Sequence, residues 1–459
     1  MTVRRIAVID VGKTNAKLAL VDAGDMTEIA VVTRPNAVLP GPPYPHFDVD
    51  GHWEFLLNAL AKFHADHGIG AISVTTHGAS GALIGADGCL AAPVLDYEHP
   101  GPDTVAAEYQ ALRPAFSETG SPRLPMGLNL GAQIHWQFMI EPGLRKRTDA
   151  IVTYPQFWGH RLTGALASDV SSLGAHTDLW NPHKRRFSSL VERMELADKM
   201  APARASDDIL GPLLPEVADR TGIPAETPVH CGIHDSNASL LPHVVHRKPP
   251  FSVVSTGTWV IVMTIGGARI ALEPTRDTLI NVNGLGAPVP SARFMGGREF
   301  EMISGGHAVE ADEGAMARVI SDGIMLMPAA VPESGPFQGR DAHWRGAQPN
   351  PGSPTRAAAL GFYLAMMTAE CLSLTGHRGN IVVEGPFCRN AAYIAMLSAA
   401  TECTVITSKG ATGTSQGAAM LALDLATLLP ETVDSKVAAV PRPELVDYAV
   451  RWRSAARAT

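Results

Sequence analysis

The chain has 459 residues, more than one hydrophobic core usually supports, so two large lobes are the simplest prediction. Lys and Arg number 37 against 45 Asp and Glu, which gives a formal charge of -8 and no long basic run. That charge excludes the positive surface that binds nucleic acid, and the 46% of apolar residues excludes a disordered chain. The same apolar content allows a subunit interface, as in a homodimer.

Cysteine usage and the apolar runs indicate the compartment. The five cysteines form no Cys-x-x-Cys pair, and their odd number argues against a disulfide framework. Asp10 and Lys13 interrupt the N-terminal apolar run, which leaves it too short for the core of a signal peptide. The longest apolar stretch, residues 357–368, is shorter than the roughly 20 residues of a membrane span and predicts a buried helix. We therefore expect a cytoplasmic protein without a membrane partner.

The N-terminal part alternates β-rich runs with turn signals. A break at residues 11–15 separates the first two runs, and a Pro- and Gly-rich loop follows at 35–45. Apolar periodicity predicts an amphipathic helix at 53–67. The expected strands are residues 5–10, 17–21, 29–33 and 71–75. Alternating helices and strands predict the α/β class.

A second hairpin repeats the first about half a chain later. Residues 251–255 and 259–265 predict two strands around a polar turn, and the repeat suggests a duplicated lobe. The expected elements that follow are a helix at 355–375, a strand at 381–384, a helix from Ala391, a strand at 404–407 and a helix at 416–428. Pro and basic residues interrupt the periodicity at 242–250. We therefore expect lobes of residues 1–246 and 247–459.

Two turns have the residue types that bind phosphate. DVGKTN at residues 10–15 combines an acidic strand end with backbone N–H groups, an ammonium and a hydroxyl, so the turn can face phosphate oxygens while Asp10 faces a metal ion. A plain decorated hairpin is the alternative. STGTW at residues 255–259 presents the same chemistry, and the shared pattern predicts a clamp for a polyphosphate. The Walker A pattern is absent.

Three further loops follow predicted strands. In GIHDSNA at residues 232–238, the Asp235 carboxylate can accept a hydroxyl proton, or it can cap the helix that starts there. The loops EGPFCRN at 384–390 and GATGTSQGAA at 410–419 place glycines where a base and a ribose can approach the backbone. Taken singly, each of these loops is also an ordinary strand-to-helix turn.

In order and spacing, these sites resemble the FGGY carbohydrate kinases of the actin, Hsp70 and sugar kinase superfamily. LTG at residues 162–164 and SDVS at 168–171 are similar to a segment of that family, and GAHTDLW at 174–180 resembles the branch near rhamnulokinase and fuculokinase. The resemblance implies a two-lobed, actin-like (ribonuclease H-like) α/β fold with ATP in the cleft between the lobes. The N-terminal lobe would bind sugar and hold the catalytic loop, and the C-terminal lobe would bind the nucleotide.

The resemblance also implies roles for single residues. Asp235 is expected to be the catalytic base beside the sugar, and Asp10 and Asp235 are expected to hold Mg²⁺. His77 and Asp96 match by position the loops that hold sugar hydroxyls, although His77 can equally be a structural histidine. The residues expected to bind ATP are Gly12, Lys13, Thr14, Asn15, Thr256, Gly257, Thr258, Gly385, Asn390 and Gln416.

Three residues depart from the family pattern. Lys13 stands where many relatives have Thr or Ser, so its contact with phosphate is inferred from charge alone. Pro386 replaces the second glycine of the usual pair, which stiffens the expected nucleotide wall. Glu98 replaces a frequent Arg beside the expected sugar site.

The sequence accordingly predicts an ATP-dependent carbohydrate kinase, a phosphotransferase to an alcohol group. Its substrate is expected to be the primary hydroxyl of a small ketose: a tetrulose, a pentulose or a deoxyhexulose. Two alternatives share the fold, namely a non-catalytic nucleotide-dependent switch like actin and an aldose kinase. The Asp235 loop separates the kinase from the switch, because a switch needs no hydroxyl base.

Overall fold

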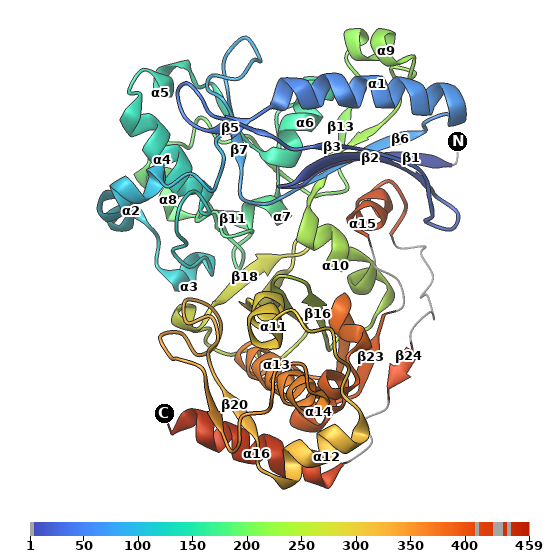
Figure 1. Ribbon diagram of the computed structural model, residues 1–459. Coiled ribbons are helices and arrows are strands. Elements are labelled where there is room, and N and C mark those ends of the chain that lie inside the picture. Colours follow the sequence, from blue (N-terminus) through green and yellow to red (C-terminus); the bar gives the residue numbers. More distant parts are fainter. Residues whose placement is uncertain (1–3, 409–412, 426–434, 438–441, 459) are drawn as a thin grey trace. The chain divides into compact units, whose positions relative to one another are not determined.

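The structure is a computed structural model that describes residues 4–408, 413–425, 435–437 and 442–458 (Figure 1). It divides into two compact units. Unit 1 comprises Met1–His246, Ile280–Pro288 and Thr412–Leu429, and unit 2 comprises Arg247–Leu279, Val289–Ala411 and Pro430–Thr459. The chain thus leaves unit 1 after His246, but two later segments of the expected C-terminal lobe return to it.

Unit 1 is built on a mixed sheet of seven strands with the order β13-β14-β6-β1-β2-β3, in which β15 also pairs with β6. Its strands are β1 (Arg5–Val11), β2 (Asn15–Asp22), β3 (Glu28–Pro35), β6 (Ala71–Thr76), β13 (Ile209–Gly211), β14 (Val229–His230) and β15 (Ile233–His234). β1 is antiparallel to β2 and parallel to β6. Because β1 lies between two partners, its apolar run is fully buried on both faces.

Helices cover both faces of this sheet. Ala7 and Ile9 of β1 share a core with α1, while Ile6 and Val8 share another with α10 and α15. The helices that frame the site are α1 (Val49–His67), α6 (Tyr154–Thr163), α7 (Val170–Leu173), α10 (Asp235–His246) and α15 (Thr414–Met420). α1 begins before the expected residue 53 because Asp48 caps it, accepting a hydrogen bond from the backbone N of Gly51.

The rest of unit 1 consists of short elements. The strands are β4 (Val38–Leu39), β5 (His46–Phe47), β7 (Gly81–Ile84), β8 (Ala150–Thr153), β9 (Ser168–Asp169), β10 (Trp180–Asn181), β11 (Arg186–Phe187) and β12 (Ala203–Arg204). The helices are η1 (Gly101–Val105), α2 (Ala106–Leu112), α3 (Phe116–Thr119), α4 (Leu130–Ile140), α5 (Leu144–Arg147), α8 (Ser189–Arg193) and α9 (Pro215–Thr221). β4 lies inside the stretch expected to be a loop at 35–45.

Unit 2 repeats the strand arrangement of unit 1. Its sheet has the order β18-β19-β17-β16-β22-β23-β24, in which β18 runs into the segment Ile280–Pro288 that is counted with unit 1. The strands are β16 (Phe251–Thr256), β17 (Val260–Ile265), β18 (Thr278–Val282), β19 (Pro288–Phe294), β22 (Asn380–Glu384), β23 (Val405–Thr407) and β24 (Ser435–Val437). The hairpin of β16 and β17 pairs in parallel with β22 and antiparallel with β19, just as the hairpin of β1 and β2 pairs with β6 and β3. The duplication suggested by the two hairpins therefore extends over four strands.

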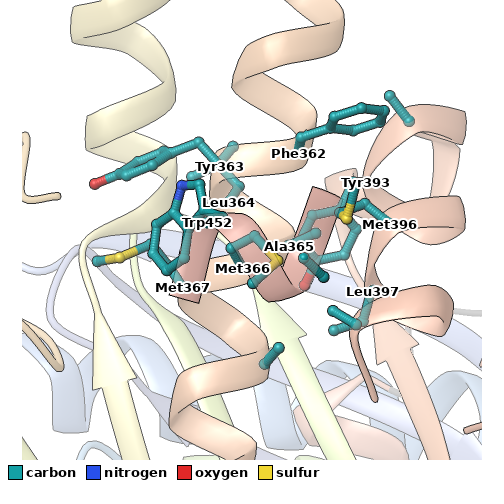
Figure 2. Packing of buried hydrophobic residues seen from close by; sticks show 14 of the residues in the cluster. Phe362, Tyr363, Leu364, Ala365, Met366, Met367, Tyr393, Met396, Leu397 and Trp452 are labelled. Atoms are coloured by element: carbon teal, nitrogen blue, oxygen red, sulfur yellow. The ribbon is translucent and has the colours of Figure 1, made fainter. Parts of the chain in front are cut away.

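The core of unit 2 surrounds α13 (Pro354–Leu374). This helix is long and apolar enough to cross a membrane, the one such helix in the described residues, yet 89% of its most apolar window is buried. Figure 2 shows Phe362, Met366 and Met367 of α13 packed among side chains of neighbouring helices. The expected buried helix is thus confirmed. The other elements are η2 (Pro274–Arg276), α11 (Gly296–Ser304), α12 (Glu313–Ser321), β20 (Met325–Met327), β21 (His343–Arg345), η3 (Pro386–Arg389), α14 (Ala391–Thr401) and α16 (Pro443–Arg457).

Most expected elements appear within a few residues of their predicted bounds, and all five cysteines are free. The last expected helix, residues 416–428, differs. α15 covers Thr414–Met420 and is followed by turns as far as residue 425, while 426–428 lie outside the described residues. Gly410, Ala411 and Thr412 of the Gly-rich loop also lie outside them.

Candidate functional site

The turn between β1 and β2 is held in shape by a backbone hydrogen bond and by Asn36. The backbone N of Gly12 donates to Asn15 O at 2.9 Å and closes the turn. Asn36 supports it twice, from Nδ2 to Gly12 O at 2.8 Å and from its backbone N to Thr14 O at 2.9 Å. Thr14 and Asn15 stay exposed. The turn is therefore rigid where it is supported and open where a ligand can bind.

Asp10, at the end of β1, faces Lys17 across the hairpin. The two residues are direct register partners, with Lys17 Nζ 3.5 Å from Asp10 Oδ2 and 3.3 Å from Glu28 Oε1. Burial raises the pKa of Asp10 to about 6; Lys17 opposes the rise, and the negative charge of Asp235 adds to it. Asp10 and Asp235 are thus close enough for their charges to interact.

Asp235 is the first residue of α10, and its two carboxylate oxygens differ in their hydrogen bonds. Oδ1 accepts from the backbone N of Ser236 at 2.6 Å and lies 3.1 Å from His234 Nε2. Oδ2 receives no hydrogen bond from the described residues, and one third of the side chain (33%) is exposed. A helix cap accepts from two or three residues ahead, so this is not capping geometry.

The tautomer of His234 follows from its other neighbour. Asn237 Nδ2 lies 3.1 Å from His234 Nδ1, and an amide nitrogen can only donate. Nδ1 therefore accepts, and Nε2 carries the proton that it donates to Asp235. Burial acts to raise the pKa of Asp235, but the hydrogen bonds from His234 and from the backbone N of Ser236 outweigh it, so the pKa lies below its ordinary value.

A buried network anchors the loop that holds His234. Asp169, fully buried at the start of α7, accepts from Ser171 Oγ at 2.5 Å and from Ser206 Oγ at 3.0 Å. Ser171 Oγ in turn accepts from the backbone N of His234 at 3.0 Å. Burial raises the pKa of Asp169. The SDVS segment thus acts as support for the Asp235 loop.

His77 lies in an aromatic cage beside this loop. Its ring centroid is 5.3 Å from Phe47, 5.0 Å from Tyr97 and 5.1 Å from Tyr154. Both ring nitrogens are buried without a hydrogen-bond partner among the described residues. Burial lowers the pKa of His77 to about 4, and the charge of Asp235 acts against this shift. A neutral imidazole with two unpaired nitrogens is thus available to a polar ligand.

Asp96 and Glu98 flank the same cage and both contact Lys13. Lys13 Nζ forms an ion pair with Asp96 Oδ1, and it lies 3.0 Å from Glu98 Oε2. The expected phosphate ligand Lys13 and the expected sugar ligand Asp96 are therefore paired with each other. The structure brings five predicted residues of unit 1 together: Asp10, Lys13, His77, Asp96 and Asp235.

In unit 2, the expected phosphate turn has two exposed residues and one residue whose hydroxyl is hydrogen-bonded to another loop. Gly257 and Thr258 are exposed. The hydroxyl of Thr256 is buried, donating to Glu384 O and accepting from the backbone N of Phe387 at 3.2 Å. The Thr256 hydroxyl therefore stabilises the next loop and is not free for phosphate.

The three residues expected near the nucleoside have different structural roles, and they do not all belong to the same unit. Gly385 has φ +82°, and a Cβ there would lie 2.0 Å from Thr256 O, so only glycine fits. Asn390 caps α14 by accepting from the backbone N of Tyr393 at 3.0 Å. Gln416 belongs to unit 1, where its Nε2 donates to Met26 O at 3.0 Å. Gln416 is thus not part of the unit that contains Gly385 and Asn390.

Comparisons with known proteins match almost the whole chain. Residues 5–242 match the N-terminal domain of the FGGY family of carbohydrate kinases, and residues 248–430 match the C-terminal domain of carbohydrate kinase FGGY. The chain belongs to the FGGY family of carbohydrate kinases.

Individual relatives agree with this family. A crystal structure of a carbohydrate kinase from Novosphingobium aromaticivorans is 33% identical, covers 100% of both chains and has a TM-score of 0.91. The xylulose kinase of Rhodospirillum rubrum is similar in fold, with a TM-score of 0.79 at 18% identity over 99% of this chain and 98% of that one. An L-fuculokinase from Salmonella typhi is 25% identical over 270 residues. That match covers 57% of each protein, so the chain spans little more than half of this curated relative.

The fold is therefore the two-domain, actin-like α/β fold of the FGGY sugar kinases.

A magnesium ion fits the residues of unit 1. No group of three or more His, Cys, Asp or Glu side chains suited to a metal occurs in the described part of the chain. Mg²⁺ commonly takes only one or two carboxylates together with substrate phosphates, and Asp10 and Asp235 are two carboxylates whose charges interact.

Three site residues of this FGGY protein were missed from sequence. Lys17 was read only as part of a strand, although the hairpin register with Asp10 would have placed it. Asn36 fell in an expected loop, and Asn237 was read only as the start of a helix. The contact of Asn36 with Gly12 joins residues 24 positions apart, for which the sequence offers no spacing signal. Asn237 lies three residues after His234, a spacing that brings two side chains together at the start of a helix.

Proposed function

We propose that this FGGY protein is an ATP-dependent kinase that transfers phosphate to a primary hydroxyl of a small ketose, with Asp235 as the general base. The observation that carries the proposal is that the two oxygens of the Asp235 carboxylate differ in their hydrogen bonds. His234 and Ser236 orient Oδ1, while Oδ2 stays free of hydrogen bonds from the described residues. A carboxylate held in this way can take a proton from a substrate hydroxyl.

The reaction follows from that arrangement. The sugar hydroxyl oxygen attacks the γ-phosphorus of ATP as its proton passes to Asp235 Oδ2. The new O–P bond forms while the bond from the γ-phosphorus to the bridging oxygen breaks, and ADP leaves with the electron pair. The lowered pKa keeps Asp235 ionised at neutral pH, as a base must be. Mg²⁺ held by Asp10 and Asp235 would offset negative charge on the phosphates.

The substrate class rests on the sugar-facing side chains and on the relatives. His77, Asp96 and Asp235 offer hydrogen bonds to several hydroxyls from one region of unit 1. The relatives include an L-fuculokinase and a xylulose kinase, and fuculose and xylulose are ketoses. A non-catalytic switch is disfavoured, because it would not need an oriented carboxylate beside unpaired polar groups.

Two measurements test the proposal. ADP release should rise above background with at least one sugar in a panel of tetruloses, pentuloses, deoxyhexuloses and aldoses. Asp235→Asn should keep its melting temperature and sugar affinity, yet lose a hundredfold or more in kcat, since general bases typically contribute ~10² to 10⁴-fold. Asp219→Asn, an exposed change in α9, is the matched control and should keep full activity.

The outcomes separate the alternatives. Turnover with aldoses alone would replace the ketose assignment, and background rates with every sugar would favour the nucleotide switch. An Asp235→Asn variant with kcat within about threefold of the wild type, far less than a base contributes, would remove Asp235 from the mechanism.

A further inference from the structure

We propose that Lys13 is a positioning residue of the sugar site, which holds the carboxylates of Asp96 and Glu98 in place, and that it does not bind the phosphates of ATP. This inference rests on the proposed kinase function, because it assigns Lys13 to one of that reaction's two substrates. It replaces the phosphate contact expected from the charge of Lys13 and its place in the turn.

The first observation is that the Lys13 ammonium is already surrounded. It pairs with Asp96 Oδ1 and with Glu98 Oε2, the latter at 3.0 Å. It also lies 4.7 Å from the ring centroid of Tyr97 and 5.3 Å from that of Phe47. Two carboxylates and two aromatic faces together stabilise a cation strongly in a partly buried place. A phosphate would have to compete with these four groups for the ammonium.

The second observation concerns what Lys13 does to Asp96. Oδ1 of Asp96 accepts from Lys13 and from the backbone N of Glu98, the latter at 3.2 Å. No described residue donates to Oδ2, although the side chain is only 11% exposed. Lys13 therefore fixes the carboxylate so that one oxygen remains for a ligand. In Asp235, too, one carboxylate oxygen is hydrogen-bonded and the other is not.

The third observation links Lys13 to His77. Phe47 and Tyr97 contact the His77 ring as well as the Lys13 ammonium, and the charge of Lys13 contributes to lowering the pKa of His77. The unpaired nitrogens of His77 and the unpaired oxygen of Asp96 thus belong to one cage. A polyol presents neighbouring hydroxyls that can pair with both. Removal of the ammonium would also leave Asp96 and Glu98 as adjacent like charges.

The test compares sugar and ATP separately. For Lys13→Met, the KM for the best sugar and the sugar Kd from calorimetry without ATP should both rise about tenfold or more, as expected when hydrogen bonds to charged groups are lost. The KM for ATP should stay within about twofold, since no such bond to phosphate is lost. Lys13→Arg should restore part of the sugar affinity, because a guanidinium can still pair with two carboxylates. Lys62→Met, which removes an exposed ion pair with Asp66, should change neither constant.

A double-mutant cycle gives a second readout. If Lys13 acts through Glu98, Lys13→Met combined with Glu98→Gln should affect sugar affinity less than the sum of the single changes. The double variant also removes the like-charge pair, so it keeps the test possible if Lys13→Met folds poorly. Additive effects, or a KM for ATP that rises more than the KM for sugar, would overturn the proposal. Failure of the wild type to phosphorylate any sugar would instead remove the proposed function.

Discussion

Buried polar side-chain atoms without partners occur in both units of the described chain, and His77 at the candidate site is one of the residues that carry them. His77 has two such nitrogens, and it differs in this from His52, which is also buried in unit 1. His52 pairs with Arg34 Nη1 and with Asn36 Oδ1, both at 2.7 Å. An unpaired buried polar atom costs free energy, so a histidine without partners is expected where a ligand completes its bonding.

Replacement of His77 therefore separates binding from stability. His77→Leu places an apolar side chain in the aromatic cage and removes two buried nitrogens that have no partner among the described residues. The melting temperature without sugar should therefore be unchanged or raised. The sugar KM should rise about threefold to tenfold, the range of one or two lost neutral hydrogen bonds. Activity and thermal melts on the same preparation measure both effects.

His52→Leu is the contrasting variant. It breaks two formed hydrogen bonds of a buried side chain, so it should lower the melting temperature. If His77→Leu lowers the melting temperature as much as His52→Leu and leaves the sugar KM unchanged, then His77 is a structural histidine.

At the scale of elements, the site depends on how closely α15 approaches α10. A Cβ at Gly417 of α15 would lie 1.8 Å from the backbone O of Ala238 in α10. Both helices pack on Ile6 and Val8 of β1, the strand that ends at the turn expected to bind phosphate. Small residues in α15 thus let the two helices share one face of the sheet.

Gly417→Ala should disturb this packing. Because the clash is with backbone, the helices must separate, and overpacking of this kind costs about 1 to 3 kcal/mol. Urea unfolding should show a lower midpoint. Gly314→Ala, at an exposed position of α12, is the control and should be neutral or slightly stabilising, as alanine favours helices. Equal midpoints for Gly417→Ala and the wild type would mean that α15 shifts without cost.

At the scale of the whole molecule, a buried acid in unit 2 links stability to pH. Glu299 is fully buried in α11, and burial raises its pKa to about 7. Val331 N donates to its Oε1 at 3.2 Å, while Oε2 is buried without a partner in the described residues. The folded protein thus keeps Glu299 protonated at pH values where the unfolded chain ionises it.

The direction of the pH effect follows. A raised folded pKa means that the unfolded chain releases the proton first, so stability is full below the ordinary value of 4.5 and falls as pH rises to about 7. Glu299→Gln cannot ionise and should gain up to about 3 kcal/mol over the wild type between pH 5 and pH 8. Urea unfolding at both pH values measures this difference. Glu301→Gln, at an exposed position of the same helix, should show no gain in the free energy of unfolding. An equal gain for both variants would show that Glu299 stays ionised.

The sequence by itself determined the strands and helices, because apolar periodicity and turn residues act over short stretches of chain. The strands of the two hairpins, the buried helix α13 and the start of α10 at Asp235 appear close to their predicted bounds. The spacing of the motifs also identified the FGGY family, which the two domain matches confirm.

Only the tertiary structure decided which partners the polar side chains have. Lys13 pairs with a residue 83 positions away, and the Thr256 hydroxyl bonds residues 128 and 131 positions away. The expected phosphate contact of Lys13 rested on its charge, and that of Thr256 on its place in a polar turn; the structure adds partners for both side chains that neither pattern predicts. Charge and hydrogen-bonding capacity are properties of a residue, but the group that satisfies them is set by packing between distant segments.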